Sequence, residues 1–260
     1  MGPKIIKYTL LIFGLIMAIC LYIIDKKLAK VKKSDTVVIN SASIYYPIKD
    51  QLISSKVCAN IAYSELAVAI VFYAFSTKAI TKTKLFKLLS DVILFAAYFN
   101  ICDIVCGLLK MFVDEPRPNF ISMCKITENK LYYTHEDCKV DQLKYSDLIS
   151  SFPSGHSSIM MSTILISWYF LFKNKKQGFI LYALGFIIFT VVSVVNSIVV
   201  LTRIADHKHH IIDIVVPLIY TPIIYIVMLR VKRKASNLLK SYDYKDVNVE
   251  NKAVSDVEEV

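Results

Sequence analysis

The sequence predicts an all-α, polytopic membrane protein whose six transmembrane helices form one bundle. The first observation is composition: 55% of the 260 residues are hydrophobic, whereas soluble domains usually contain about 45–50% apolar residues. The second is clustering, because the apolar residues gather in segments near the length of about 20 residues that a helix needs to cross a bilayer. Lipid offers no hydrogen-bond partner to the backbone, so each segment is expected to be a helix.

The six predicted spans follow one another along most of the chain, and the fourth is the shortest. They cover residues 5–24, 57–76, 88–109, 157–172, 178–200 and 211–229. The first has a cleaved signal peptide as its alternative, but it is long for the hydrophobic region of a signal peptide and has no small-x-small cleavage site before Asp25.

The spans make up one domain, residues 1–229, and a polar tail of residues 230–260 follows it. The tail begins with basic residues and becomes acidic. Because it has no apolar face to bury, we expect it to be disordered.

The charges between the spans indicate which side each loop occupies. Six spans place loops 25–56, 110–156 and 201–210 on one side, and loops 77–87 and 173–177 on the other side with the tail. The short loops and the start of the tail are rich in lysine and arginine, which predicts a cytoplasmic location. The lysine-rich start of the first loop favours the opposite orientation, but the rule weighs short loops most. The three longer loops are therefore expected outside the cell or in the lumen, in a plasma membrane or an endomembrane.

The net charge of +10 is explained by this topology rather than by nucleic-acid binding. The sequence has no zinc-finger spacing and no RNA-binding signature. A transporter is also disfavoured, because no pair of interrupted helices is visible. The sequence gives no indication of oligomeric state.

The cysteines divide into two groups. Cys124 and Cys138 share the loop 110–156, where a disulfide and two free thiols both fit, and an oxidising compartment would favour the disulfide. The others lie in or beside apolar segments without the partners of a metal site, and are expected to be inert: Cys20, Cys58, Cys102 and Cys106.

Four polar side chains fall inside the apolar segments, where each needs a partner. We expect hydrogen bonds between helices rather than functional contacts. These residues are Glu65, Asn100, Asp103 and Asn196.

Three cations lie at the predicted membrane edge on the side of the long loops: Lys110, Arg117 and Arg203. If the spans bundle, this density of positive charge requires an anion, and the arginine fork suits the oxygens of a phosphate group. Ser154 and Gly155 precede a predicted helix, so their backbone N–H groups are expected to extend the anion site.

Three further residues supply the elements of a phosphoryl-transfer site. His209 and Asp213 are four residues apart, so on a helix the carboxylate can orient the imidazole and leave its other nitrogen as a nucleophile. His156, from another helix start, is the candidate general acid. Taken singly, Lys110 is best interpreted as an interfacial anchor, whereas the fixed spacing of the set favours a shared site. The alternatives are interfacial anchors for the cations and helix-start residues without a further role for His156 and His209. The neighbouring His207 and His210 are interpreted as bystanders, and Asp206 as a loop or capping residue.

Together these patterns resemble the type 2 phosphatidic acid phosphatase superfamily, which includes the lipid phosphate phosphatases. Its motifs are K-x6-RP, PSGH and SR-x5-H-x3-D. The chain matches the first at Lys110, Arg117 and Pro118, the second at 153–156, and the third at Arg203, His209 and Asp213; Thr202 stands where the family usually has serine.

The resemblance implies a metal-independent phosphatase without a cofactor, which forms a phosphohistidine on His209 and uses His156 as the acid and Asp213 to orient His209. It implies that five residues bind the substrate phosphate: Lys110, Arg117, Ser154, Gly155 and Arg203. The substrates implied are lipid phosphates in the bilayer: phosphatidic acid, lysophosphatidic acid, sphingosine 1-phosphate or ceramide 1-phosphate. The alternatives are an isoprenyl- or diacylglycerol-diphosphate phosphatase, a glucose 6-phosphatase, and a non-enzymatic lipid-binding protein, although non-enzymatic relatives lack the catalytic histidines that this chain retains.

Overall fold

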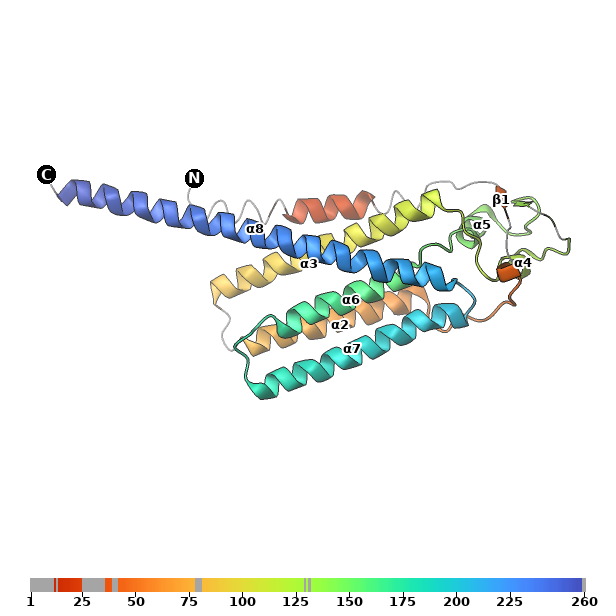
Figure 1. The fold of residues 1–260 in the computed structure, drawn as a ribbon, viewed down its shortest axis with the longest axis horizontal. Helices are drawn as coiled ribbons and strands as arrows, with labels where there is room; N and C mark the ends of the chain where they lie inside the picture. Colours follow the sequence, from red (N-terminus) through yellow and green to blue (C-terminus); the bar gives the residue numbers. More distant parts are fainter. Residues whose placement is uncertain are drawn as a thin grey trace.

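A computed structural model describes most of the chain. It covers residues 12, 14–24, 36–38, 42–77, 81–128, 130 and 132–258, with the side chains of 36–38, 42 and 238–258 outside the description. Five long helices dominate: α2 (Ser55–Ser76), α3 (Lys82–Phe112), α6 (Gly155–Phe172), α7 (Phe179–Ala205) and α8 (Ile211–Glu258). They lie side by side along the length of the molecule (Figure 1).

Four helices in the described part of the chain have the length and apolarity of membrane spans: α2, α3, α7 and the portion Ile211–Asn237 of α8. The all-helical membrane architecture is therefore confirmed, but six spans are not shown. The apolar helix Gly14–Ile24 is shorter, and the start of the predicted first span lies outside the described residues. The fourth predicted span, in α6, is not among the four because hydroxyl side chains dilute its apolar sequence.

Helix α6 is the centre of the bundle, and its position explains its composition. It contacts α2, α3, α7 and α8, so little of it faces the surroundings. Small hydroxyl side chains allow helices to approach closely. Those buried on α6 are Ser157, Ser158, Ser162, Thr163 and Ser167.

Several helix starts have the capping residues that local physical chemistry requires. Ser54 accepts a hydrogen bond from the backbone N–H of Val57 at 3.3 Å, and Asp141 accepts one from that of Lys144 at 2.9 Å. Asp141 begins α5 (Gln142–Leu148). These caps set where the connecting segments end and the helices begin.

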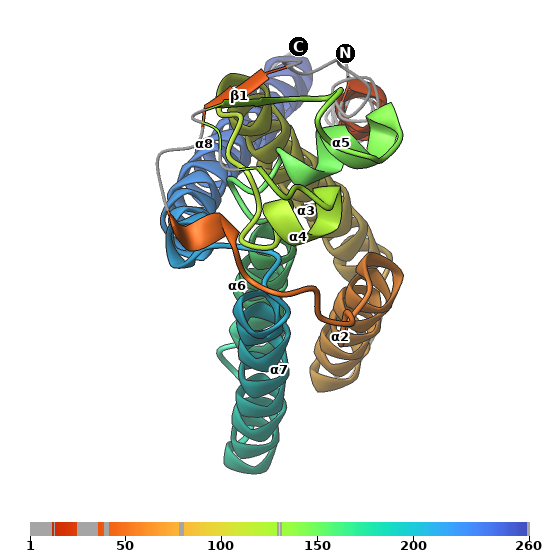
Figure 2. The same ribbon diagram turned by 90° about the vertical axis from the view of Figure 1, so that its right-hand side faces the viewer.

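The connections divide between the two ends of the bundle as the chain order predicts. The end of α2, the start of α3 and the turn from α6 to α7 lie at one end, together with the later part of α8 (Figure 1). The segments before α2, between α3 and α6, and between α7 and α8 lie at the other end, where α4 (Phe120–Cys124) and α5 cover the bundle (Figure 2). All three predicted motifs are therefore at one end.

The segment between α3 and α6 is a small folded unit rather than a simple loop. Its core contains Phe120, Tyr133, Tyr145 and Leu148, all buried, with Ile44 from the 3-10 helix Ala42–Ile44. A disulfide joins Cys124 to Cys138. A two-stranded antiparallel ribbon of β1 (Thr36–Val38) and β2 (Tyr132–Thr134) adds the one departure, within the described residues, from a wholly helical fold.

Two of the predicted contacts between helices are confirmed. The Asn196 amide donates to the Glu65 carboxylate at 2.6 Å and joins α7 to α2. The Asn100 amide donates to the carbonyl of Ala18 at 2.9 Å, which fixes the helix Gly14–Ile24 against α3.

The backbone of 230–258 continues α8 as a helix to Glu258. No glycine or proline interrupts this stretch, so local helix propensity carries the helix on. The disorder expected of the tail stays a prediction.

A buried carboxylate ties the opposite end of the bundle together. Asp91 on α3 is 2% exposed, forms ion pairs with Lys173 after α6 and Lys232 on α8, and accepts a hydrogen bond from the Tyr169 hydroxyl at 3.0 Å. One anion thus links three helices.

Replacing Asp91 by Asn should destabilise the protein markedly, because two partly buried ammonium groups lose their shared anion. Removing one partner of a buried ion pair costs on the order of 3 kcal/mol. Thermal unfolding of the purified protein in detergent measures the loss, with Glu136→Gln on the exposed surface as the matched control. A Tm of Asp91→Asn equal to that of the control would contradict the assignment.

Candidate active site

The site forms where the ends of four helices meet beneath the small folded unit. Lys110 lies in the last turn of α3 and Arg203 in the last turn of α7. Ser154 caps the start of α6, and Asp213 lies in the first turn of α8. Helix ends from distant parts of the sequence therefore bring the three motifs together.

The end of α7 has a turn that directs the chain back toward the site. His207 has a φ of 54°, which is the left-handed region. Its N–H donates to the carbonyl of Ile204 at 3.0 Å, and the N–H of Lys208 donates to that of Arg203 at 3.0 Å. This pair of bonds is a Schellman motif, and it places His209 directly beyond the helix end.

His207 and His210 have structural roles at this turn. The Nδ1 atom of His207 lies 3.0 Å from the carbonyl of Pro47, and its ring contacts Tyr46 at 4.8 Å between centroids. The Nε2 atom of His210 lies 3.0 Å from the carbonyl of Pro116. These contacts agree with their interpretation as bystanders to the chemistry, and they anchor the turn to neighbouring segments.

His209 is buried with one ring nitrogen fixed. Nδ1 lies 2.8 Å from the carbonyl of Ser151 and 3.5 Å from Oδ2 of Asp213. In the described part of the chain, no hydrogen bond to Nε2 is present. Burial lowers the pKa of His209 to about 4; the Asp213 carboxylate opposes this, and Arg117 and Lys110 lower the pKa further. The imidazole is therefore neutral at pH 7, with Nδ1–H donating and Nε2 carrying a free lone pair.

Asp213 connects α8 to both neighbouring segments. Oδ2 accepts the backbone N–H of His210 at 2.8 Å, which is one half of a capping box, and the Ser151 hydroxyl at 2.5 Å. Its backbone carbonyl accepts the N–H of Ser154 at 2.8 Å. That carbonyl is free because Pro217, four residues later, has no N–H to donate to it. A proline inside α8 thus allows α6 to attach.

The start of α6 differs in one respect from its prediction. The Ser154 N–H is bonded to Asp213, so it is not available to an anion, and the Ser154 hydroxyl accepts the N–H of Ser157 at 3.4 Å. At Gly155, an added Cβ would meet no atom within 4 Å. There is therefore open space beside the first N–H groups of the helix, where an anion can approach.

Arg117 and Lys110 are both tied to α5 and the segment after it. Arg117 forms an ion pair with Asp147 at 2.6 Å, and its Nη1 donates to the carbonyl of Lys208 at 3.2 Å. Lys110 donates to the carbonyl of Ser150 at 2.5 Å. The two cations from the first motif therefore lie against the segment that leads into PSGH.

Arg203 is almost completely buried and paired with an acid that sequence reasoning missed. Its Nη2 donates to Asp206 at 2.5 Å, where both side chains are nearly inaccessible. Its Nη1 lies 3.5 Å from Nε2 of His156. Asp206 also accepts the backbone N–H of Leu52 at 3.1 Å. The spacing of three residues between Arg203 and Asp206 at a helix end was the available signal for this pair.

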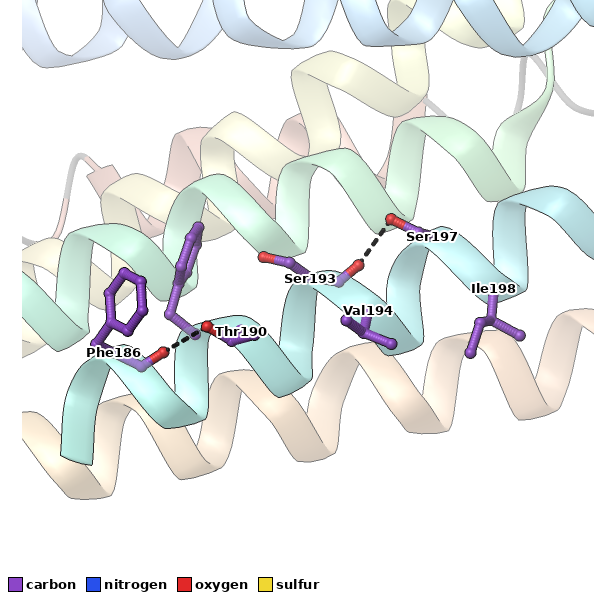
Figure 3. A pocket seen from close by; sticks show the side chains of 7 residues that line it. Phe186, Thr190, Ser193, Val194, Ser197 and Ile198 are labelled. Carbon is purple, nitrogen blue, oxygen red and sulfur yellow. Dashed lines mark hydrogen bonds between the residues drawn. The ribbon is translucent and has the colours of Figure 1, made fainter. Parts of the chain in front are cut away.

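The described pocket belongs to another part of the molecule. It is an open groove on α7, lined by Phe186, Phe189, Thr190, Ser193, Val194, Ser197 and Ile198 (Figure 3). The Thr190 hydroxyl bonds to the carbonyl of Phe186 at 2.9 Å and that of Ser197 to the carbonyl of Ser193 at 2.8 Å. The Ser193 hydroxyl is buried and has no hydrogen-bond partner among the described residues, so two of the three hydroxyls of this face are satisfied within the helix. The groove shares no residue with the candidate active site.

The fold and the site define a helical membrane protein with a cation-rich centre around two histidines. A family model of the PAP2 superfamily matches residues 91–236, more than half of the 260 residues and all three motifs. The chain belongs to the PAP2 superfamily, as the motifs indicated.

Two curated relatives come from Dictyostelium discoideum, and each is a PA-phosphatase related-family protein. One is 25% identical over 124 residues, covering 41% of this chain and 36% of its own length. The other is 24% identical over 131 residues, covering 44% of this chain and 35% of its own length. The match thus spans about a third of each relative. No solved structure matches the chain significantly.

The lowered pKa of His209 predicts a pH-dependent stability. The folded state holds this ring neutral down to a pKa of about 4, whereas the unfolded chain protonates it near 6.5. Stability from this residue is therefore complete above pH 6.5 and decreases as the pH falls toward 4, by about 2 kcal/mol at pH 5. Unfolding at pH 7.5 and pH 5 should show a smaller pH effect in His209→Gln than in the natural chain. Equal pH effects in the two proteins would contradict the prediction.

Proposed function

We propose that this protein is a lipid phosphate phosphatase that acts without a metal ion and forms a phosphohistidine on His209. The observation that carries the proposal is the state of His209: Nδ1 is held by the Ser151 carbonyl at 2.8 Å, while Nε2 is uncommitted among the described residues. A neutral imidazole held in one tautomer beside cations has the properties of a nucleophile toward a phosphate ester.

In the first step, Nε2 of His209 attacks the phosphorus atom and the bond from phosphorus to the lipid oxygen breaks. Burial and the neighbouring Arg203 lower the pKa of His156 to about 3, so its ring is neutral in the empty site. The substrate therefore brings the proton as its monoanion and passes it to His156. The electron pair of the broken bond remains on the lipid oxygen, which takes this proton from His156. In the second step, water attacks the phosphohistidine and gives its proton to His156. The P–N bond breaks, its electron pair returns to His209, and inorganic phosphate leaves.

The two arginines have different roles because their carboxylate partners differ in exposure. The side chain of Asp147 is 65% exposed, and exposed ion pairs contribute only about 0–1 kcal/mol. A phosphate with two negative charges can therefore replace it on Arg117 at little cost. Asp206 is 2% exposed, so its pair with Arg203 persists and orients Nη1 toward His156 and the substrate.

The position of the site supports lipid phosphates as the proposed substrate class. The cations are at the ends of apolar helices, where the headgroup of a lipid reaches them while its chains stay in the bilayer. Phosphatidic acid, lysophosphatidic acid, sphingosine 1-phosphate and ceramide 1-phosphate all present a phosphate monoester at this depth. Charge stabilisation comes from Lys110, Arg117, Arg203 and the start of α6 near Gly155, so the chemistry has no step that needs a metal ion.

His209→Ala should abolish release of inorganic phosphate from phosphatidic acid in the presence of EDTA, because no nucleophile remains. The assay uses purified protein in mixed micelles with each of the four lipid phosphates, and with an isoprenyl diphosphate as the competing substrate class. Phosphate release only after addition of Mg²⁺ would contradict the metal-independent mechanism.

The matched control for this variant is His207→Asn. It removes a neighbouring imidazole but keeps a residue that tolerates the left-handed backbone at φ 54°. It should retain activity within about threefold of the natural chain, since the His207 ring contacts Tyr46 and the carbonyl of Pro47, away from the His209 ring. Full activity of His209→Ala would exclude the proposed nucleophile.

We also propose that the site faces the lumen or the outside of the cell. The disulfide between Cys124 and Cys138 beside the site supports this side, because disulfides persist in oxidising compartments. The cluster of basic residues at the other end supports a cytoplasmic position there.

Cysteine labelling in sealed endoplasmic reticulum vesicles, with the cytoplasmic face outward, tests this orientation. In a Cys20→Ser background, Leu143→Cys on α5, at a position 85% exposed, should be protected from an impermeant maleimide until the vesicles are permeabilised. Lys175→Cys at the opposite end should react at once. The reverse pattern would contradict the proposed orientation.

A further inference from the structure

Ser151 is a fully buried residue that none of the three motifs includes. It lies in the short segment between α5 and α6, and its exposure is 0%. Burial of a serine removes its polar groups from water, so each needs a partner inside the protein. The partners of Ser151 all belong to segments that carry the site.

The carbonyl of Ser151 is the main acceptor for the nucleophile. It lies 2.8 Å from Nδ1 of His209, within the range of 2.7–3.2 Å usual for such bonds. Oδ2 of Asp213 is 3.5 Å from the same nitrogen. The shorter contact, with the Ser151 carbonyl, determines which tautomer His209 adopts. Because a carbonyl can only accept, the proton stays on Nδ1, and the Asp213 carboxylate is the more distant acceptor.

The hydroxyl of Ser151 holds that charge in place. It donates to Oδ2 of Asp213 at 2.5 Å, and the carbonyl of Lys208 is farther from it, at 3.4 Å. The other carboxylate oxygen, Oδ1, is buried and has no hydrogen-bond partner among the described residues. The position of the carboxylate therefore depends on Oδ2. Among the described residues, Oδ2 accepts hydrogen bonds from the Ser151 hydroxyl and the N–H of His210, and lies farther, at 3.5 Å, from Nδ1 of His209.

The backbone N–H of Ser151 fixes the residue to the first motif. It donates to the carbonyl of Glu115 at 2.9 Å, two residues before Arg117. The three polar groups of Ser151 thus reach the segment of Arg117, the ring of His209 and the side chain of Asp213.

We propose that Ser151 is a positioning residue for the phosphoryl transfer, and that its hydroxyl makes Asp213 effective by holding the carboxylate beside His209. This inference rests on the proposed function of the site. Ser151 does not touch the substrate; it acts through His209 and Asp213.

Ser151→Ala isolates the role of the hydroxyl, because it keeps the carbonyl that binds Nδ1. We expect kcat to fall about tenfold, in line with the loss of one charge-assisted hydrogen bond, while KM stays within twofold because no phosphate contact changes. Ser151→Thr, which restores the hydroxyl, should recover most of kcat. Ser146→Ala on α5 is the matched control and should leave both constants unchanged.

A double-mutant cycle separates this role from a general structural one. If the hydroxyl acts through Asp213, then Ser151→Ala in an Asp213→Ala background should lower kcat by less than twofold. A tenfold loss in both backgrounds, or an effect of Ser151→Ala on KM alone, would overturn the proposal. So would a kcat of Ser151→Ala within twofold of the natural chain.

A measurement that does not depend on turnover distinguishes failure of this inference from failure of the proposed function. In protein with labelled histidine, the Nδ1–H of His209 should exchange with water about tenfold faster in Ser151→Ala than in the natural chain or in Ser146→Ala. Equal exchange in all three would overturn the role of Ser151. A natural chain that released no phosphate from any lipid phosphate would overturn the proposed function, whatever the exchange rates.

Discussion

The attachment of the start of α6 to the start of α8 is the contact on which the candidate active site depends. The Ser154 N–H bonds to the Asp213 carbonyl at 2.8 Å, and Pro217 leaves that carbonyl available because it has no N–H of its own. This single bond sets PSGH beside the third motif. With α6 packed against four other helices, the bundle holds the helix ends in place while the segment between α3 and α6 supplies Ser151 and closes the site.

Both arginines of the site form ion pairs with carboxylates of the protein when no ligand is bound. Arg203 has a buried carboxylate partner, Asp206, and Arg117 has an exposed one, Asp147. The difference in exposure divides the two arginines into a fixed group and an exchangeable group. In the proposed function, a phosphate would gain its binding groups without the cost of ordering them, since Arg203 and Lys110 are already held. This preorganisation is what electrostatic stabilisation of a transition state requires.

The sequence predicted the helical membrane class and the family because apolar length and motif spacing are local patterns. It did not predict how Asp147, Asp206 and Ser151 pair, since two of these contacts join positions that only the fold brings together. The shortfall at α6 has a physical cause: a central helix meets other helices rather than lipid, so its buried serines lower its hydropathy. The Ser154 N–H was expected to bind an anion. It donates instead to the carbonyl of Asp213, which Pro217 leaves without a partner within the helix. The small core around Phe120 and Tyr145 was not predicted, because the apolar residues that form it show no helical or strand periodicity in the sequence.

The most direct measurement of the central claim is to trap the covalent intermediate. Purified protein is mixed with phosphatidic acid labelled in its phosphate group, quenched in alkali within the first turnover and digested for mass spectrometry. The account predicts a phosphate on His209 that is stable in alkali and lost in acid, and that is missing from His209→Ala. Turnover with no labelled protein, or with the label on another residue, would contradict it.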